Sequence, residues 1–208
     1  MTRRTPTRRP KMPEPKATTR AILLDRDGTI NRDVGFTHRV EDLELLPGAV
    51  EGLARMAALS FRLLIVTNQS GVARGYFTEA DMHAFNRALC DRLGQHNITI
   101  DAVYCCPYHA TEGKGDYRRD SVLRKPNDGM IRQAAQEHHL ALAHCFVVGD
   151  KNSDVVAGQR AGCHTVLLRT GAAGSDAVEL TSPPDYVADD LADAAAFVER
   201  IEQAKLNT

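Results

Sequence analysis

The stretch AILLDRDGTIN, residues 21–31, decides the fold, because four apolar residues are followed at once by two carboxylates, Asp25 and Asp27. An uninterrupted apolar run of this length is typical of a strand that is buried on both faces of a sheet. In parallel sheets, ligands bind beyond the carboxyl ends of the strands. The stretch therefore predicts a buried strand that delivers two acids to a binding site, with Gly28 allowing the tight turn that aims them.

Short apolar runs alternate with helical patterns along the rest of the chain. Strands are predicted at residues 21–25, 61–68, 98–106, 145–150, 164–170 and 185–190. Helices are predicted at residues 47–60, 78–96, 128–140 and 153–162, the second of them capped by Thr78 and Asp81 and the last stopped by Gly162. This alternation predicts an α/β fold, a Rossmann-like doubly wound parallel sheet with helices on both faces.

Length and composition indicate one globular domain. The chain has 208 residues, of which 43% are hydrophobic, and its 26 basic and 27 acidic residues nearly cancel. We therefore expect a single domain over residues 21–208, a monomer with no nucleic-acid or membrane partner. No apolar run is long enough for a membrane span or follows the first residues as a signal would, and we expect a cytoplasmic protein.

Residues 1–20 are different in composition. They contain seven Lys or Arg and four Pro, with almost nothing apolar, which predicts a disordered basic, Pro-rich tail. A solubilising extension, a nucleic-acid-binding arm and a targeting arm all remain open for this segment. The five cysteines, an odd number in a chain without an export signal, are expected to be reduced thiols.

Further polar side chains stand at the ends of the predicted strands. Thr67 and Asn68 end the second strand, Asp150 ends the fourth, and Lys125 lies in a loop before the third helix. Each of these alone is as consistent with a solvated turn as with a site. Carboxylates, a hydroxyl and a lysine gathered at one edge of a sheet are the groups that metal-assisted phosphoryl transfer needs.

That chemistry assigns a role to each group. Asp25 is the expected nucleophile, which forms an aspartyl phosphate, and Asp27 is the expected general acid and base. Mg²⁺ would be bound by Asp25, by the main-chain carbonyl of Asp27 and by Asp150, since this ion prefers oxygen ligands. Lys125 and Thr67 would bind the phosphoryl oxygens. We expect clustered acids to help keep Asp27 protonated.

Four motifs of the chain resemble those of the haloacid dehalogenase superfamily. They are DRDGT, the TN that ends the second strand, RKP and GDKNSD. The longer fragments LDRDGTIN, TNQSGVARGYFTEADM, RKPNDGM and VGDKNSDVVAG, within residues 21–169, are similar to the D-glycero-D-manno-heptose 1,7-bisphosphate 7-phosphatase branch.

This resemblance implies Mg²⁺-dependent hydrolysis of the C7 phosphate of the heptose bisphosphate, a small sugar phosphate that leads to nucleotide-activated heptose for lipopolysaccharide biosynthesis. Histidinol-phosphate phosphatases are near relatives, so hydrolysis of histidinol phosphate or another small phosphate ester is the alternative. The fragment TNQSGVARGYF distinguishes the chain from those relatives. A catalytically idle binding protein and a nucleic-acid end phosphatase are hypotheses of other classes.

The spacing of the motifs leaves no room for a cap domain over the site, so specificity is expected from the loops that follow the first three strands. Gly71 and Gly75 flank Arg74 in the second of these loops, which suggests a hinged segment that brings a cation to the substrate. Asn68, Gln69, Arg74 and Arg124 are the predicted substrate-binding residues. 

Arg124 precedes Lys125 directly, so its guanidinium is placed to bind a second phosphate on the same sugar. The alternative is that Arg124 pairs with a nearby acid, Asp120 or Asp128.

Members of this family usually hold a structural zinc ion before the RKP motif, through Cys-x-His and Cys-x-Cys. In this chain, only Cys106 of those four ligands is retained, because Tyr108, Ser121 and Leu123 occupy the other positions. Structural zinc needs four ligands, so we do not expect it here.

Overall fold

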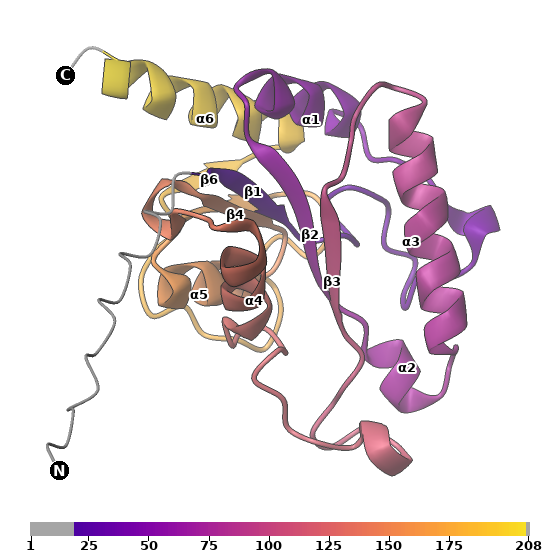
Figure 1. The fold of residues 1–208 in the computed structure, drawn as a ribbon. Coiled ribbons are helices and arrows are strands. Elements are labelled where there is room, and N and C mark those ends of the chain that lie inside the picture. Colours follow the sequence, from indigo (N-terminus) through magenta and orange to yellow (C-terminus); the bar gives the residue numbers. More distant parts are fainter. Residues whose placement is uncertain (1–18, 207–208) are drawn as a thin grey trace, which may run out of the picture.

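The computed structural model describes residues 19–206 and contains one six-stranded sheet (Figure 1). Its spatial order is β3-β2-β1-β4-β5-β6, and every pair of neighbours is parallel. The strands are β1 (Ala21–Leu24), β2 (Arg62–Asn68), β3 (Ala102–Cys106), β4 (Phe146–Gly149), β5 (His164–Leu168) and β6 (Tyr186–Ala188). The predicted α/β fold with a doubly wound parallel sheet is confirmed.

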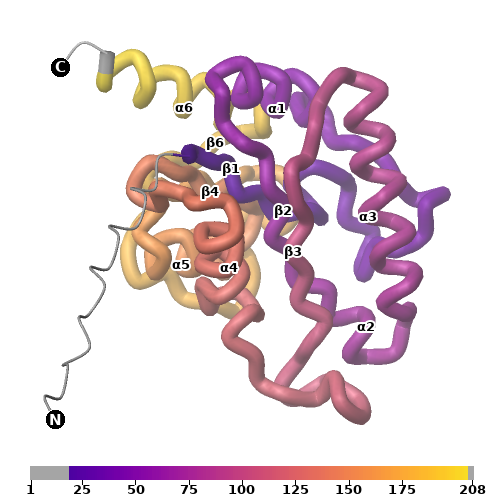
Figure 2. The backbone as a smooth tube through the Cα atoms, viewed as in Figure 1, coloured from indigo at the N-terminus to yellow at the C-terminus, as the bar shows by residue number. Residues whose placement is uncertain are grey.

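Helices cover both faces of this sheet (Figure 2). They are α1 (Ala49–Ala58), α2 (Ser70–Arg74), α3 (Glu79–Gly94), α4 (Gly129–His138), α5 (Asn152–Ala161) and α6 (Leu191–Leu206). Helices α1, α3 and α6 pack with Ile22 and Leu63 on one face, whereas α4 and α5 pack with Leu23 and Leu64 on the other. Neighbouring residues of each strand thus serve opposite cores, which is why β1 is apolar throughout.

Local signals set the helix ends where the sequence predicts them. The Thr78 hydroxyl accepts a hydrogen bond from the Asp81 amide, and the Asp81 carboxylate accepts one from the Thr78 amide, which forms a capping box at the start of α3. Gly162 ends α5 with a φ of 80°, a left-handed conformation that glycine adopts at little cost.

Two helices were not predicted. Helix α6 buries Leu191 and Val198 against the α1 face, although its many alanines make the apolar stripe weak in the sequence. Helix α2 occupies the segment that we expected to be a hinged loop. That expectation is wrong at Gly71, which lies inside the helix and is needed because the ring of Phe77 packs directly on it. Gly75 ends the helix in a left-handed conformation.

Thr19 and Arg20, which we expected to belong to the tail, contact the rest of the domain. The Thr19 carbonyl accepts a hydrogen bond from the amide of residue 141, at 2.9 Å. The Arg20 guanidinium pairs with Glu202, donates to the Leu59 carbonyl and lies 4.5 Å from the ring centre of Phe61. The remaining part of the predicted tail, residues 1–18, lies outside the described residues.

Between residues 19 and 206, no connection between strands holds an inserted domain, as the spacing of the motifs predicts. No helix in that range has both the length and the apolar character needed to cross a membrane.

Candidate active site

A pocket of about 540 Å³ lies at the carboxyl ends of β1 and β2. The sequence-predicted residues that line it are Asp25, Asp27, Thr67, Asn68, Gln69, Arg124 and Lys125. Asp150 follows β4 and shares a carboxylate cluster with Asp25 at the same edge. Arg74 is the predicted site residue that belongs to neither group. The parallel sheet therefore brings together residues that lie up to 125 positions apart (150 − 25).

The ammonium group of Lys125 is buried and surrounded by oxygen atoms. Its Nζ lies 3.0 Å from Asp25 Oδ1 and 2.5 Å from Asp154 Oδ1, and it donates a hydrogen bond of 2.7 Å to the Val66 carbonyl. Burial alone would lower the pKa of Lys125, but the carboxylates of Asp154 and Asp25 outweigh it and hold that pKa above its usual value. Lys125 is thus a fixed cation beside the predicted nucleophile.

Three buried carboxylates gather at this edge of the sheet. Oxygen atoms of Asp25, Asp150 and Asp154 all lie within 4.8 Å of one another. A second cation, the Nζ of Lys151, lies 3.7 Å from Asp25 and 3.8 Å from Asp150. Two ammonium groups therefore face three carboxylates. A cluster of carboxylate oxygens with excess negative charge suits a hard divalent cation such as Mg²⁺.

The titration behaviour of the three acids reflects their unequal surroundings. Burial raises the pKa of Asp150 to about 7, and the charge of Asp25 adds to this effect. Burial also raises the pKa of Asp154, to about 6. Burial acts on Asp25 in the same direction, but the ammonium groups of Lys125 and Lys151 outweigh it and lower its pKa. Asp25 is therefore the member that these neighbours keep ionised, as a nucleophile requires.

Asp27 stands apart from the acidic cluster. Its two carboxylate oxygens accept hydrogen bonds from Arg26 Nε at 3.0 Å, Arg26 Nη2 at 2.8 Å, Asn31 Nδ2 at 2.9 Å and Gln69 Nε2 at 2.8 Å. The expectation that Asp27 lies among clustered acids is wrong, because its hydrogen-bond partners are N–H donors and the carboxylate cluster consists of Asp25, Asp150 and Asp154. Arg26 is itself fully buried, and its Nη1 donates to Asn86 on α3.

Two side chains that we predicted to bind substrate hold predicted catalytic residues in place. Asn68 donates to the Lys125 carbonyl at 3.0 Å and accepts from the Lys125 amide at 3.1 Å. The Gln69 side-chain amide donates both to Asp27 and to the Thr67 hydroxyl, the latter at 2.9 Å. Because the Thr67 oxygen accepts this bond, its own proton is available to an acceptor in the pocket.

Arg124 lies in the loop that precedes α4, and Arg74 is the last residue of α2. Nη1 of Arg124 donates to the Tyr108 carbonyl at 3.3 Å, and Nη1 of Arg74 lies 3.1 Å from Glu112. Burial lowers the pKa of Arg124, and the charge of Arg74 contributes in the same direction. Like charges held near each other favour an anion between them.

The predicted alternative partners of Arg124 are engaged elsewhere. The Asp128 carboxylate lies 2.7 Å from Arg132 Nη2, and the Asp120 carboxylate accepts from the Ser121 amide. Across the part of the chain that the structure describes, no carboxylate lies within ion-pair distance of Arg124. Its charge is therefore available to a ligand.

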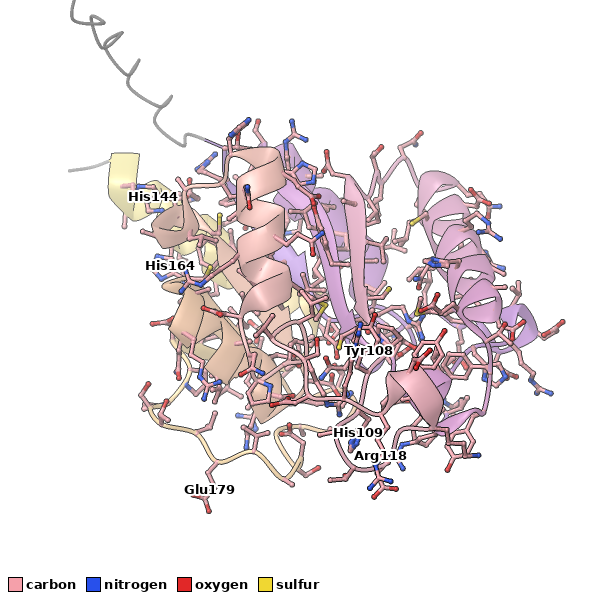
Figure 3. All side chains as sticks on the ribbon, turned by 60° about the horizontal axis from the view of Figure 1, so that its bottom comes forward. Tyr108, His109, Arg118, His144, His164 and Glu179 are labelled. Atoms are coloured by element: carbon pink, nitrogen blue, oxygen red, sulfur yellow. The ribbon has the colours of Figure 1, made fainter. Side chains whose placement is uncertain are left out.

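The loop that follows β3 carries the positions where relatives hold zinc. Tyr108 replaces the histidine. The guanidinium carbon of Arg119 lies 3.8 Å from the centre of its ring, and the ring of Tyr117 stacks on it with 6.1 Å between the ring centres. Ser121 accepts a hydrogen bond from the Leu123 amide. Phenol, hydroxyl and isobutyl groups do not replace thiolate and imidazole ligands, so these residues do not fit a structural zinc ion. Figure 3 labels Tyr108, His109 and Arg118 on this loop.

The chain is similar over most of its length to known phosphatases. Residues 122–194 match the family model described as HAD-hydrolase-like. The chain is 37% identical over 184 residues to a D-glycero-beta-D-manno-heptose-1,7-bisphosphate 7-phosphatase from Pasteurella multocida, which covers 88% of this chain and 98% of that protein. It belongs to the haloacid dehalogenase-like hydrolases. The Escherichia coli K12 protein of the same name is 35% identical over 181 residues, 86% of this chain and 94% of its own.

Solved structures of haloacid dehalogenase-like proteins share this fold. A D,D-heptose 1,7-bisphosphate phosphatase from B. bronchiseptica, in complex with magnesium and phosphate, is 31% identical, with a TM-score of 0.76 over 88% of this chain and 99% of that one. A HAD-like phosphatase from Mesorhizobium loti is 33% identical, with a TM-score of 0.77 over 88% and 87% of the two chains. The present haloacid dehalogenase-like chain is a phosphoric monoester hydrolase.

Sequence reasoning missed three charged residues of this hydrolase site. Asp154 and Lys151 both lie in the motif GDKNSD, and the spacing of Asp150 and Asp154 was a usable signal. Asp154 lies in the first turn of α5, which begins shortly after Asp150 at the carboxyl end of β4. Arg26 stands between two acids in the sequence. Nothing in the sequence pattern indicated that its side chain would be buried beside Asp27.

Proposed function

We propose that this protein hydrolyses the C7 phosphate of D-glycero-D-manno-heptose 1,7-bisphosphate through an aspartyl-phosphate intermediate. The observation that carries the mechanism is the contact of the buried Lys125 ammonium with Asp25, 3.0 Å apart at the floor of the pocket. The substrate is supported by the names of relatives that align over at least 94% of their own length.

In the first step, an oxygen of Asp25 attacks the phosphorus atom, and the bond from phosphorus to the C7 oxygen breaks. Asp27 delivers a proton to that leaving oxygen. To carry this proton, the Asp27 carboxylate gives up one of its contacts with Arg26 or Gln69. In the second step, water attacks the phosphorus of the acyl phosphate, loses its proton to Asp27, and releases inorganic phosphate and free Asp25.

The transferred phosphoryl group carries negative charge that the pocket has to balance. Lys125 supplies a fixed positive charge, and the Thr67 hydroxyl supplies a hydrogen-bond donor. Both are held by neighbouring side chains before the substrate arrives, which is the arrangement that lowers the reorganisation cost of the reaction.

Asp25, Asp150 and the main-chain carbonyl of Asp27 would hold Mg²⁺, and the buried carboxylate cluster is the observation that fits this ion. When bound, the ion neutralises charge on the phosphoryl oxygens and on the acids. Asp154 then has the separate task of holding Lys125, from 2.5 Å.

Arg124 would bind the C1 phosphate that remains on the sugar. Its guanidinium lines the pocket one residue from Lys125, and no carboxylate in residues 19–206 pairs with it. Two cations on adjacent residues match two phosphates on one substrate. Binding energy from the distal phosphate would orient the sugar so that C7, rather than C1, meets Asp25.

A panel of phosphate esters tests this proposal. The purified protein is assayed with Mg²⁺ on the heptose bisphosphate, histidinol phosphate and a small alkyl phosphate, and the heptose product is identified by ³¹P NMR. We expect the highest kcat/KM for the bisphosphate, with the C1 phosphate retained. A higher kcat/KM for histidinol phosphate would reject the substrate and keep the mechanism.

A further inference from the structure

Asn86 is the polar member of the buried face of helix α3. The other buried side chains of this helix, Met82, Phe85, Leu89 and Leu93, pack in hydrophobic clusters. Only 6% of Asn86 is exposed to solvent. A buried amide destabilises a fold unless its oxygen and its nitrogen both find partners. The partners of Asn86 therefore indicate what its side chain does.

Both ends of the Asn86 amide make hydrogen bonds inside the protein. Its Oδ1 accepts from Nη1 of Arg26 at 2.7 Å, and its Nδ2 donates to the Sγ of Cys105 on β3 at 3.3 Å. Burial raises the pKa of Cys105, so the sulfur is a neutral thiol and a weak acceptor. A guanidinium carries no acceptor, so only the amide oxygen can face Arg26. The orientation of the Asn86 side chain is thus determined by its partners.

Helix α3 anchors the Arg26 guanidinium at a second point, and the main chain adds a third. The guanidinium carbon lies 4.4 Å from the ring centre of Phe85, and Nη2 donates to the Thr37 carbonyl at 2.7 Å. The same guanidinium donates from Nε and Nη2 to the two carboxylate oxygens of Asp27. Because a guanidinium is planar and rigid, a fixed Nη1 also fixes the directions of the protons that face Asp27. The contact of Asn86 therefore reaches the Asp27 carboxylate through one rigid group.

We propose that Asn86 is a positioning residue for the proton transfers of Asp27 and acts through Arg26. This inference rests on the acid and base role of Asp27 in the proposed function, but it does not depend on which phosphate ester is the natural substrate. When Asp27 gives up one contact to carry the proton, a fixed guanidinium keeps the carboxylate aimed at the leaving oxygen. Without the Asn86 contact, guanidinium and carboxylate would shift together.

The test compares two esters that differ in their need for a proton. Ethyl phosphate releases a strongly basic alkoxide that has to be protonated, whereas p-nitrophenyl phosphate releases a stable phenolate that does not. Neither ester carries a sugar or a second phosphate. The measured quantity is the ratio of kcat/KM for ethyl phosphate to kcat/KM for p-nitrophenyl phosphate, which reports on the acid in the first step.

Asn86→Leu keeps the size of the side chain and removes the acceptor of Arg26. It should lower this ratio about tenfold, because a general acid contributes a factor of about a hundred or more that depends on its alignment. Asn86→Asp retains an oxygen at the same position and should keep the ratio within about twofold of the wild type. Leu89→Val, the matched control, shortens another buried side chain of α3 that has no contact with Arg26, and it should leave the ratio unchanged while lowering the melting temperature.

A second measurement follows the phosphorylated protein. With p-nitrophenyl phosphate, Asn86→Leu should accumulate phosphorylated Asp25, because its formation needs no acid, whereas its hydrolysis needs Asp27 as a base. Rapid acid quenching should detect more of this species than in the wild type or in Leu89→Val. A change in packing alone would not separate the two steps in this way.

Asn86→Ala answers the same question without placing apolar bulk beside the guanidinium, so the test does not depend on the folding of Asn86→Leu. Equal losses on the two esters in both variants would overturn the proposal, and so would an unchanged ratio. Asp27→Asn, measured in a single turnover, is the reference that removes the acid itself. Failure of the proposed mechanism is recognised separately, because Asp27→Asn would then leave the ratio unchanged, and the assignment of Asn86 would fall with it.

Discussion

Nζ of Lys125 lies closer to Asp154 than to the predicted nucleophile, at 2.5 Å from Asp154 Oδ1 and 3.0 Å from Asp25 Oδ1. Asp154 is buried on the first turn of α5, and its Oδ2 also accepts a hydrogen bond from the Lys151 amide at 3.0 Å. The start of a helix therefore fixes the position of a lysine that comes from a different loop. Asp154 is a positioning residue for Lys125.

Asp154→Asn should lower kcat at least tenfold, because the buried Lys125 loses its nearest counter-charge and its fixed position. Removal of one partner of a buried ion pair typically costs about 3–5 kcal/mol, so the melting temperature should fall as well. Steady-state kinetics and thermal unfolding measure the two effects. Asp128→Asn is the matched control, since Asp128 pairs with Arg132 near the surface, and it should change neither quantity appreciably. Wild-type kcat in Asp154→Asn would contradict the positioning role.

Asp25→Asn should lower turnover by several orders of magnitude, because an amide oxygen is a poor nucleophile of nearly the same size. Rapid acid quenching with a ³²P-labelled substrate should detect a phosphorylated wild-type protein and none in the variant. Asp27→Asn should also be nearly inactive, since the carboxamide neither donates an acidic proton nor accepts one from water. Substantial turnover by Asp25→Asn would require a different mechanism.

Much of the fold and the centre of the site followed from a few sequence features. The apolar run before Asp25 and the polar ends of the later strands predicted a parallel sheet and its ligand edge, because parallel topology brings all carboxyl ends to one side. Helix α2 was not predicted, since it depends on Gly71 packing against Phe77, a contact that periodicity does not encode. The partners of Asp27 were missed for the same reason. Arg26 and Asn31 are near Asp27 in the sequence, but only the fold directs their side chains, and that of Gln69, to its carboxylate.

Arg124→Ala should lower kcat/KM for the heptose bisphosphate about a hundredfold, since a charge-assisted bond to phosphate contributes about 3 kcal/mol. A small monophosphate should be affected far less, so the ratio of the two values is the measured quantity. Arg132→Ala, which removes a surface arginine from α4, is the control and should leave the ratio unchanged. Equal losses on both substrates, or early release of the C1 phosphate, would rule out the assignment.

Chelation with EDTA should abolish hydrolysis, and added Mg²⁺ should restore it, because the two ammonium groups do not balance the three buried carboxylates of the cluster that contains the nucleophile. Asp150→Asn should raise the Mg²⁺ concentration needed for half-maximal activity. Elemental analysis of the purified protein should detect no stoichiometric zinc. One zinc ion per chain that resists mild chelation would contradict our interpretation of Tyr108, Ser121 and Leu123.

Deletion of residues 1–18 should leave hydrolysis and the melting temperature unchanged, because their composition offers almost nothing to a core. Arg20→Ala should behave differently, since Arg20 pairs with Glu202 and lies over Phe61. Loss of about 1 kcal/mol would lower the melting temperature of a domain of this size by about 2–4 °C. Differential scanning calorimetry of both proteins makes the comparison, and a large drop in the deletion variant would show that the boundary is misplaced.

The loop after β3 is held by its own side chains, since Tyr108 contacts both Arg119 and Tyr117. A loop of this kind requires no metal insertion after synthesis, so it should form together with the rest of the domain. Protein refolded from denaturant in zinc-free buffer should therefore recover full activity in a single phase, without a step whose rate depends on zinc concentration. Ser121 and Leu123 carry no thiol that peroxide could oxidise, so peroxide treatment should leave the conformation of the loop around them unchanged.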